Sequence, residues 1–415
     1  MTVTAPLTRT PAPEKPAHRD GNVLRWLGAY GASMIGDNIY YVALSWAAVQ
    51  SGSPSQAGLV MAVSAAPRAL LMLGGGVIAD RLGPRRIVMA ADAVRSVAVL
   101  GVAGLFLATR PGLWPLTVLG LVFGIVDALF LPAVGALPAR VTGRDQLARV
   151  QGLRGLAVRL ANVVGAPLGG LGVALGGPAA AFGAAGLLFA ISLPLLMSLR
   201  IRDLPDDGGK SGTPARNGLA DGLRHIRRHS VLAPLVVVIA LSDLGFVGPL
   251  NVGLTLLADQ RGWGASGMGS VLAGFGVGAG AASLLLAVRG RVPRAGLVLA
   301  VTMGGGAVAI GALAFVPRLA AAVAVALVIG LLAGLSGALC GALTQTHADP
   351  AYLGRVTAVT SLSSLGLVPL TMPLTGAAVG LWGTGPVFVA SAAICALAGV
   401  YGLCRTALRR AELPA

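Results

Sequence analysis

The sequence predicts an all-α membrane protein, with twelve transmembrane helices in two pseudo-symmetric six-helix bundles. Its apolar composition, a succession of long apolar stretches and an internal repeat together predict this fold. The 415 residues are 55% hydrophobic and only 11% charged, and the mean hydropathy is +0.82. A soluble domain cannot hide that much apolar surface from water. We therefore expect lipid to surround most of the chain.

Apolar stretches of about twenty residues, each long enough to cross the hydrocarbon core, recur along the chain. The first six are expected near residues 24–48, 57–79, 86–108, 114–137, 151–174 and 178–199, and the second six near 231–257, 267–288, 295–316, 319–343, 355–380 and 385–404. These stretches define five parts: a disordered tail (1–21), a six-helix bundle (22–199), a linker with an amphipathic helix (200–230), a second six-helix bundle (231–405) and a short tail (406–415).

A shift of 206 positions superimposes one half of the chain on the other without a gap. It aligns Arg149 with Arg355, Pro167 with Pro373, Gly170 with Gly376 and Asp37 with Asp243. Matches between Ala, Gly and Leu arise easily by chance, but Arg, Pro and Gly agreeing in one register predict two like-oriented halves. Carriers that rock two bundles about a site near the bilayer midplane have this architecture. The repeat therefore favours a transporter.

The basic residues gather in alternate loops, which explains the formal net charge of +16. The opposite loops hold only Arg110, Arg261 and Arg318. Because basic loops stay in the cytoplasm, both termini are expected on the cytoplasmic side of a multi-pass protein of the cell membrane. Aromatic residues make up only 5% of the chain and form no stacking platform beside the basic clusters, which excludes nucleic-acid binding.

The sequence indicates no metal, nucleotide or catalytic site. Cys340, Cys395 and Cys404 fall in or at the end of apolar stretches, without the paired spacing of a zinc site or a disulfide framework. No Gly-rich segment joins a strand to a helix with a following Lys, as a nucleotide site requires. Since no Ser/His/Asp or Cys/His set is visible either, we expect neither an enzyme nor a bound cofactor.

The loop after the second span carries a specific motif. It runs Gly76-Val77-Ile78-Ala79-Asp80-Arg81-Leu82-Gly83-Pro84-Arg85-Arg86. This segment resembles the signature loop of the major facilitator superfamily, and it matches the pattern Gly-x-x-x-Asp-Arg-x-Gly-x-Arg-Arg in full. The resemblance implies a twelve-helix fold, and a latch that holds the two halves in the outward-facing state. The residues to which this role is carried are Gly76, Asp80, Arg81, Gly83, Arg85 and Arg86.

Shorter motifs resemble one branch of that superfamily, which holds enterobactin exporters and macrolide efflux proteins. They are Gly36-Asp37 in span one, Gly262-Trp263-Gly264 before span eight and Gly354-Arg355-Val356 before span eleven, and the resemblance covers about residues 22 to 405. Span five partly matches the antiporter pattern of the family, which implies a helix-packing role for Gly165, Pro167, Gly169 and Gly170. The resemblance implies a proton-coupled antiporter that exports a small amphiphilic compound, such as a drug, antibiotic, siderophore or natural product. We expect it to act as a monomer in the lipid bilayer.

Three carboxylates fall near the middle of predicted spans. An ionisable side chain at the bilayer centre costs about 2.5 to 3.5 kcal/mol, so each needs a partner, a wet cavity or a function. Asp37 and Asp243 occupy equivalent positions in spans one and seven, and Asp127 lies in span four. In the family, the first and fourth helices of each half line the cavity, so we expect these acids to exchange protons or to contact substrate. The alternative is a hydrogen bond between helices.

Basic residues also lie deep in the predicted spans. Arg68 in span two and Arg159 in span five are expected to counter the charge of Asp37 or Asp127, or alternatively to bind an anionic group of the substrate. Asp92 and Arg95 are three residues apart on one face of span three, so they can neutralise one another. Because both lie nearer the cytoplasm, we expect them to brace the latch loop.

Two other functions stay open at this stage. An importer of a nutrient or siderophore would have the same fold, but such sites usually carry more polar residues than this Ala-, Leu- and Gly-rich set. A non-transporting membrane receptor or integral membrane enzyme would need an extramembrane domain or a catalytic set, and the sequence shows neither. Protons and a small molecule are therefore the expected ligands, and an exporter is the favoured function.

Overall fold

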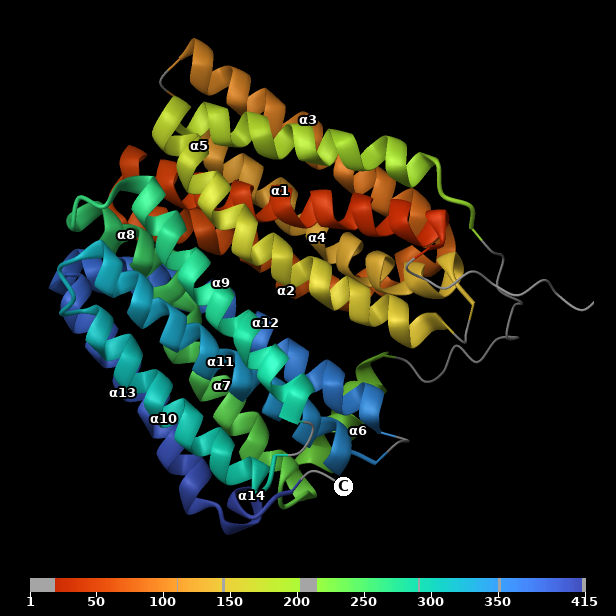
Figure 1. Cartoon of the computed structure of the whole chain (residues 1–415), viewed down its shortest axis with the longest axis vertical. Helices are drawn as coiled ribbons and strands as arrows, with labels where there is room; N and C mark the ends of the chain where they lie inside the picture. The colour runs from red at the N-terminus through yellow and green to blue at the C-terminus, as the bar shows by residue number, and fades with distance from the viewer. Residues whose placement is uncertain are drawn as a thin grey trace, which may run out of the picture.

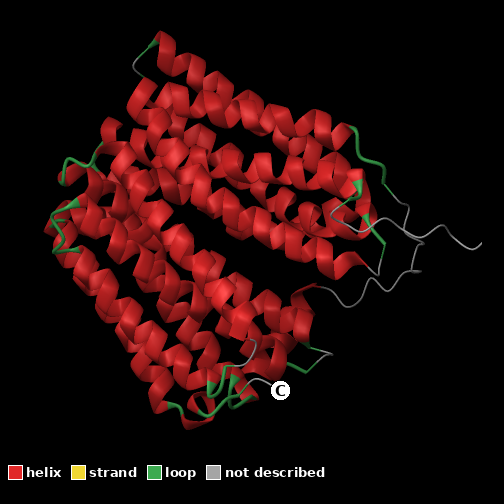
Figure 2. Ribbon diagram, in the orientation of Figure 1, coloured by secondary structure: helices red, strands yellow, loops and turns green. Residues whose placement is uncertain are grey.

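The computed structural model describes residues 19–109, 111–143, 146–201, 215–289, 292–349 and 352–412. At residues 72–81 and 215–220 and at positions 148, 287, 289 and 354 the structure describes the backbone but not the side chains. Within these ranges the chain is almost entirely helical and forms no strand, as Figure 2 shows. The predicted all-α fold is confirmed.

The first bundle is built from five continuous helices of the described chain. They are α1 (Gly21–Ser51), α2 (Pro54–Leu82), α3 (Pro84–Ala108), α4 (Trp114–Val141) and α5 (Leu147–Met197). Helix α5 makes two crossings, because its backbone leaves the helical region at Gly176 and Gly177. Gly177 has a φ of +68°, which favours glycine, and Pro178 then begins the next helical segment. The bundle therefore contains the six predicted crossings.

The second bundle follows the short helix α6 (Ala215–Arg228). Its first crossing joins α7 (Leu232–Gly248), a π-helical turn at Pro249–Gly253 and α8 (Leu254–Gln260). The π turn lies where Pro249 offers no backbone N–H to the regular helical pattern. The remaining helices are α9 (Gly264–Arg289), α10 (Ala295–Leu313), α11 (Leu319–His347), α12 (Leu353–Trp382), α13 (Thr384–Cys404) and the single turn α14 (Thr406–Arg409).

Nine helices of the described chain are long and apolar enough to cross a membrane. One of them, Arg149–Met197, contains the break in α5, and α1 and α2 are 31 and 29 residues long. Together they give the twelve predicted crossings. Large apolar side chains such as Leu107, Leu175 and Val288 are 78 to 80% exposed. Lipid is the solvent that such outward-facing side chains require.

The two bundles touch at one end and diverge toward the other (Figure 1). The diverging end carries α6, and we call it the α6 end; the opposite, touching end is the closed end. At the closed end α5 packs on α9 and α2 packs on α12. Gly170 lies against the backbone of Ala265, and Gly376 lies against the backbone of Pro54. These two glycines occupy equivalent positions in the repeat, so both bundles make the contact in the same way.

Helix α6 corresponds to the predicted amphipathic helix of the linker. It packs on α12 of the second bundle, where Gly222 meets the backbone of Arg355. The ring of His225 stacks on Tyr352, with 4.6 Å between the centroids. The linker helix is therefore held by the second bundle.

Candidate functional site

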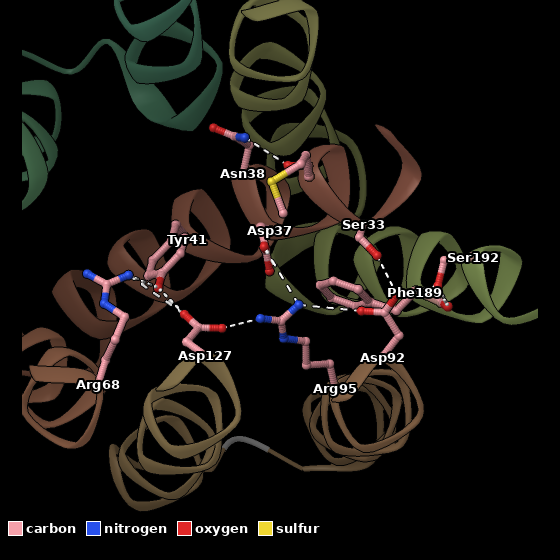
Figure 3. A network of polar contacts seen from close by, with 11 residues as sticks. Ser33, Asp37, Asn38, Tyr41, Arg68, Asp92, Arg95, Asp127, Phe189 and Ser192 are labelled. Atoms are coloured by element: carbon pink, nitrogen blue, oxygen red, sulfur yellow. Dashed lines mark hydrogen bonds and ion pairs between the residues drawn. The ribbon is translucent and has the colours of Figure 1, made fainter. Parts of the chain in front are cut away.

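A network of buried charges lies in the first bundle, at its centre (Figure 3). It contains Asp37 of α1, Arg68 of α2, Asp92 and Arg95 of α3, and Asp127 of α4. The other charged residues of these helices lie toward the helix ends, so within the membrane interior each of these five charges can avoid lipid only by pointing inward. The packing of four helices thus brings together three carboxylates and two guanidinium groups.

Arg95 is the centre of this network, and its side chain is only 1% exposed. Its Nη2 donates a hydrogen bond to Oδ1 of Asp127, and its Nη1 donates to Oδ1 of Asp92 at 3.4 Å. Nη1 also lies 3.9 Å from Oδ2 of Asp37. One guanidinium group therefore serves three carboxylates, a task for which its several donors are suited.

Three aromatic rings surround the same guanidinium group. The Cζ atom of Arg95 lies 4.1 Å from the ring centroid of Phe130 and 5.7 Å from those of Phe123 and Phe189. Cation–π attraction compensates in part for the lost water, and the rings exclude solvent from the ion pairs. Burial of Arg95 is thus made possible by both its acidic and its aromatic partners.

Asp127 has a second cation. Nη1 of Arg68 lies 3.7 Å from Oδ2 of Asp127, and the hydroxyl of Tyr41 donates to the same oxygen at 3.2 Å. Arg68 also donates to the Tyr41 hydroxyl at 3.5 Å. The expected counter-charge between Arg68 and Asp127 is therefore present in the structure.

Asp92 is the most fully satisfied carboxylate of the network. The hydroxyl groups of Ser33 and Ser192 each donate to its Oδ2 at 2.5 Å, while Arg95 occupies its Oδ1. The whole residue is inaccessible to solvent. Three charge-assisted hydrogen bonds stabilise the ionised form of this buried acid.

Asp37 is the least firmly held acid. Its Oδ1 accepts no hydrogen bond within the described structure, and its link to Arg95 is the longest of the network at 3.9 Å. Three carboxylates face two guanidinium groups, so full ionisation would leave one buried negative charge in excess. A proton on Asp37 removes that excess and disturbs the fewest contacts. Asp37 is therefore the acid of the network at which a proton would be accommodated with the least rearrangement.

A cavity of about 280 Å³ lies beside this network, between the two bundles. Asn38, Tyr41 and Asn162 line it from the first bundle, and Asn251 and Thr255 line it from the second. Apolar side chains complete the wall, among them Val42, Met61, Leu250, Met268, Leu272 and Phe275. Tyr41 lines the cavity and donates to Asp127, so it joins the cavity wall to the network.

Arg159 lines the same cavity, away from the predicted acids. Its Nη1 donates to the carbonyl oxygen of Ala279 in α9 at 3.2 Å, across the gap between the bundles. Within the described chain it forms no ion pair with Asp37 or Asp127. Of its two predicted roles, the counter-charge is absent from this conformation.

Asp243 lies in a separate cavity, inside the second bundle. That cavity has a volume of about 350 Å³, and its wall comes from α7, α10, α11, α12 and α13. No basic residue among those described forms an ion pair with Asp243, and its Oδ2 accepts no hydrogen bond there. The structure thus brings Asp37 and Asp127 together and keeps Asp243 apart.

The latch loop is only partly described, because the side chains of Gly76, Asp80 and Arg81 lie outside the described residues. Gly83, with a φ of +84°, precedes the first turn of α3. Arg85 donates to the carbonyl oxygens of Leu196 at 3.0 Å and Met197 at 2.5 Å, and it thereby ties the start of α3 to the end of α5.

The other predicted latch residues lie in different surroundings. Arg86 is exposed at the α6 end. Asp92 and Arg95 do pair with one another, but their other contacts reach Ser33, Asp127 and Ser192 of the central network. The bracing of the loop stays a prediction, because the side chains of Asp80 and Arg81 lie outside the described residues. The larger network had not been predicted for Asp92 and Arg95.

The glycines of span five pack helices closely. A side chain at Gly165 would meet Asn38, and one at Gly169 would meet Val42, both in α1. Gly170 faces Ala265 across the closed end, and Pro167 lies against Gly269 of α9. The four residues therefore serve two interfaces, one within the first bundle and one between the bundles.

Several residues of the network had not been singled out from the sequence. Ser33 and Tyr41 lie four residues before and after Asp37, on the same face of α1. Phe123 and Phe130 flank Asp127 at helical spacing in the same way. This spacing was a readable signal, whereas the contribution of Ser192 depends on how α5 packs on α3 and had no sequence signal.

Comparisons with known proteins identify the family of the chain. The family model described as "Major Facilitator Superfamily" matches residues 26–368. The chain is 28% identical over 303 residues to the enterobactin exporter EntS of Shigella boydii serotype 18, covering 72% of this chain and 71% of that protein. The EntS protein of Escherichia coli O127:H6 is 28% identical over 310 residues, covering 74% and 73%.

Solved structures share the fold. A mutant of the nucleoside transporter NupG superimposes with a TM-score of 0.72 at 11% identity, over 93% of this chain and all of that one. A bacterial homologue of the human lysosomal transporter Spinster, in an inward-facing and occupied conformation, gives a TM-score of 0.72 at 14% identity, over 97% of this chain and all of that one. Similarity at this level of identity establishes the fold alone.

Proposed function

The chain belongs to the major facilitator superfamily, and from this premise we propose that it exports a small amphiphilic compound in exchange for protons. The observation that carries the proposal is the charge imbalance of the buried network, in which three carboxylates share two guanidinium groups. Asp37 is the proton carrier in this account, because it is the acid of the network with the fewest partners.

We assign the α6 end to the cytoplasm, because the loops rich in basic residues lie there. The bundles touch at the closed end through Gly170 and Gly376, so the conformation described is inward-facing. Cargo then enters the central cavity from the cytoplasm. The apolar wall of that cavity suits an amphiphilic molecule, and Asn38, Asn162 and Asn251 supply hydrogen-bonding groups.

Coupling follows from the contacts of Asp37. When Asp37 is ionised, Arg95 is shared among three acids; when Asp37 is protonated, Arg95 interacts more strongly with Asp92 and Asp127. A change in these contacts shifts how α1 packs on α3 and α4, and α1 also lines the cavity through Asn38 and Tyr41. Proton binding and cargo binding therefore act on the same helix, which is the requirement for a coupling free energy between two sites.

The direction of transport is supported by the relatives. The two proteins at 28% identity are named as enterobactin exporters, and they match about 72% of this chain.

The test uses everted membrane vesicles with an acidified interior, to which enterobactin or the macrolide erythromycin is added. Exchange would release protons from the interior, which a pH-sensitive dye reports. We expect Asp37→Asn to abolish this release, and Glu412→Gln, which changes an exposed acid far from the network in sequence, to leave it intact. Normal release by Asp37→Asn would refute the role of Asp37, and proton-driven uptake by whole cells would refute the direction.

A further inference from the structure

The interiors of the two bundles can be compared position by position. The shift of 206 positions places many buried residues of one bundle on buried or half-buried residues of the other. This holds for α1 with α7, for α4 with α11, and for the second half of α5 with α13. Gly36 lies against Phe189 in the first bundle. Their equivalents in the second bundle, Ser242 and Cys395, are also in contact, with 3.9 Å between the Ser242 carbonyl oxygen and Sγ of Cys395. The register read from the sequence therefore holds for these helices in the fold.

Large side chains in the first interior are replaced by small ones in the second. Phe123, Asp127, Phe130 and Phe189 correspond to Ile329, Ala333, Ser336 and Cys395. All four replacements line the cavity of about 350 Å³ that contains Asp243. The space that rings and a guanidinium group occupy in the first bundle is thus open in the second.

The second interior keeps the acid and lacks the cation. Asp243 corresponds to Asp37, but α10, the counterpart of α3, has no charged residue between Ala295 and Leu313. Oδ2 of Asp243 is buried and accepts no hydrogen bond from the described residues. A carboxylate that faces a cavity in the membrane interior without a cation is costly unless a ligand or a proton neutralises it.

We propose that this cavity binds a small organic cation, a protonated amine on an apolar body, with the ammonium group at Asp243. The hydroxyl groups of Ser242 and Ser364 lie in the same wall and can accept hydrogen bonds from the amine. Phe246, Met303 and Ile310 provide the apolar surface. The volume falls within the range of about 300 to 1,000 Å³ that is usual for small-molecule sites.

A path leads to this site from the α6 end. An adjoining cavity of about 340 Å³ shares Ile239, Cys340 and Ser364 with the cavity that contains Asp243. Its wall extends to Thr344 and Thr357, near the ends of α11 and α12 that lie beside α6. Hydroxyl groups along this wall can accept hydrogen bonds from an ammonium group that has lost part of its hydration water.

The three cysteines provide a direct test. Cys340 and Cys395 line the cavity, whereas Cys404 is exposed at the end of α13. We expect phenethylamine to slow the labelling of the first two by N-ethylmaleimide about tenfold at ten times its Kd, and to leave Cys404 unaffected. The neutral analogue 2-phenylethanol should protect much less, and Na⁺ alone should not protect.

Two variants decide the outcome. Asp243→Asn should abolish protection by phenethylamine. Ser336→Phe should abolish it too, because it retains Asp243 but fills the cavity with a phenyl ring at the position equivalent to Phe130. Asp37→Asn should keep full protection, so loss of coupling and loss of this site are distinguishable. Equal protection by 2-phenylethanol, protection by Na⁺ alone, or unchanged protection in Asp243→Asn would each overturn the proposal.

Discussion

The two bundles have the same fold but different interiors. The first is closely packed and charged, with Arg95 and Arg68 shared among three acids and enclosed by rings. The second has one acid, Asp243, in a cavity lined by hydroxyl, thiol and small apolar groups. The difference teaches that the repeated backbone does not need a buried charge network for its stability. The network in the first bundle therefore has to be explained by function.

The largest expected effect is the removal of Arg95. In Arg95→Leu three buried carboxylates keep only Arg68 as a cation, and breaking a buried pair in this way costs about 3 to 5 kcal/mol. In the second bundle Asp243→Asn removes the charge from a partly buried group without an ion pair among the described residues, so we expect no loss of stability. Thermal unfolding of the purified proteins in detergent measures both. Equal losses would show that the second interior also depends on its charge.

The closed end offers the opposite test, because there the two bundles are alike. Gly170→Val and Gly376→Val each place a side chain against backbone of the other bundle, and such overpacking costs about 1 to 3 kcal/mol. Both should shift the protein toward opening at the closed end, measured by spin-label distances between the ends of α2 and α12. Gly104→Val is the matched control, since a Cβ added at Gly104 would meet no atom within 4 Å. A response to only one of the two variants would contradict their equivalence.

A smaller loss than that of Arg95→Leu is expected when Asp92 loses a hydroxyl donor. Ser33→Ala or Ser192→Ala removes one of two hydrogen bonds to the same oxygen, at a cost of about 1 to 3 kcal/mol for a charged, buried acceptor. The second bundle has Ile239 and Ala398 at the equivalent positions, which agrees with the absence of an acid at the position corresponding to Asp92. Unfolding temperatures of the single and double variants check this, and a double variant as stable as the parent would contradict it.

The fold was largely predictable because it follows from composition and period. Twelve apolar stretches and the alternation of basic loops are properties of single segments. The repeat register, which aligns Gly170 with Gly376, can likewise be read from the sequence without knowing how the helices pack. The sequence also placed Asp37, Asp127 and Arg68 in the membrane interior, where few partners are available to a charge.

The partnerships were harder to predict, because they depend on how helices rotate against each other. Arg95 pairs with Asp92 within one helix, and this local contact could be read from their spacing. Its contacts with Asp127 and Phe189 join α3 to α4 and α5, so they appear only in the fold. The cavity at Asp243 was hidden for the same reason, since it results from small residues on several helices.

The smallest expected effect concerns pH and the linker helix, which only the second bundle holds. Burial, followed by the nearby His347 and His225, lowers the pKa of His229 below its usual value of about 6.5. The packed state therefore binds fewer protons than the detached state, and α6 packing weakens as the pH falls below 6.5. Once corrected for the intrinsic exchange rate at each pH, hydrogen exchange of residues 221–229 should show less protection at pH 5.5 than at pH 7.5, and His229→Asn should reduce the difference. Exchange that is slower at pH 5.5, once corrected for intrinsic rates, would contradict this.

The most direct test of the account is the protonation state of the buried acids, measured by infrared difference spectroscopy between two pH values. We predict one titrating carboxyl band from the first bundle, which disappears in Asp37→Asn and persists in Asp92→Asn. A band that survives in Asp37→Asn, or that is lost in Asp92→Asn, would contradict the claim that Asp37 carries the proton.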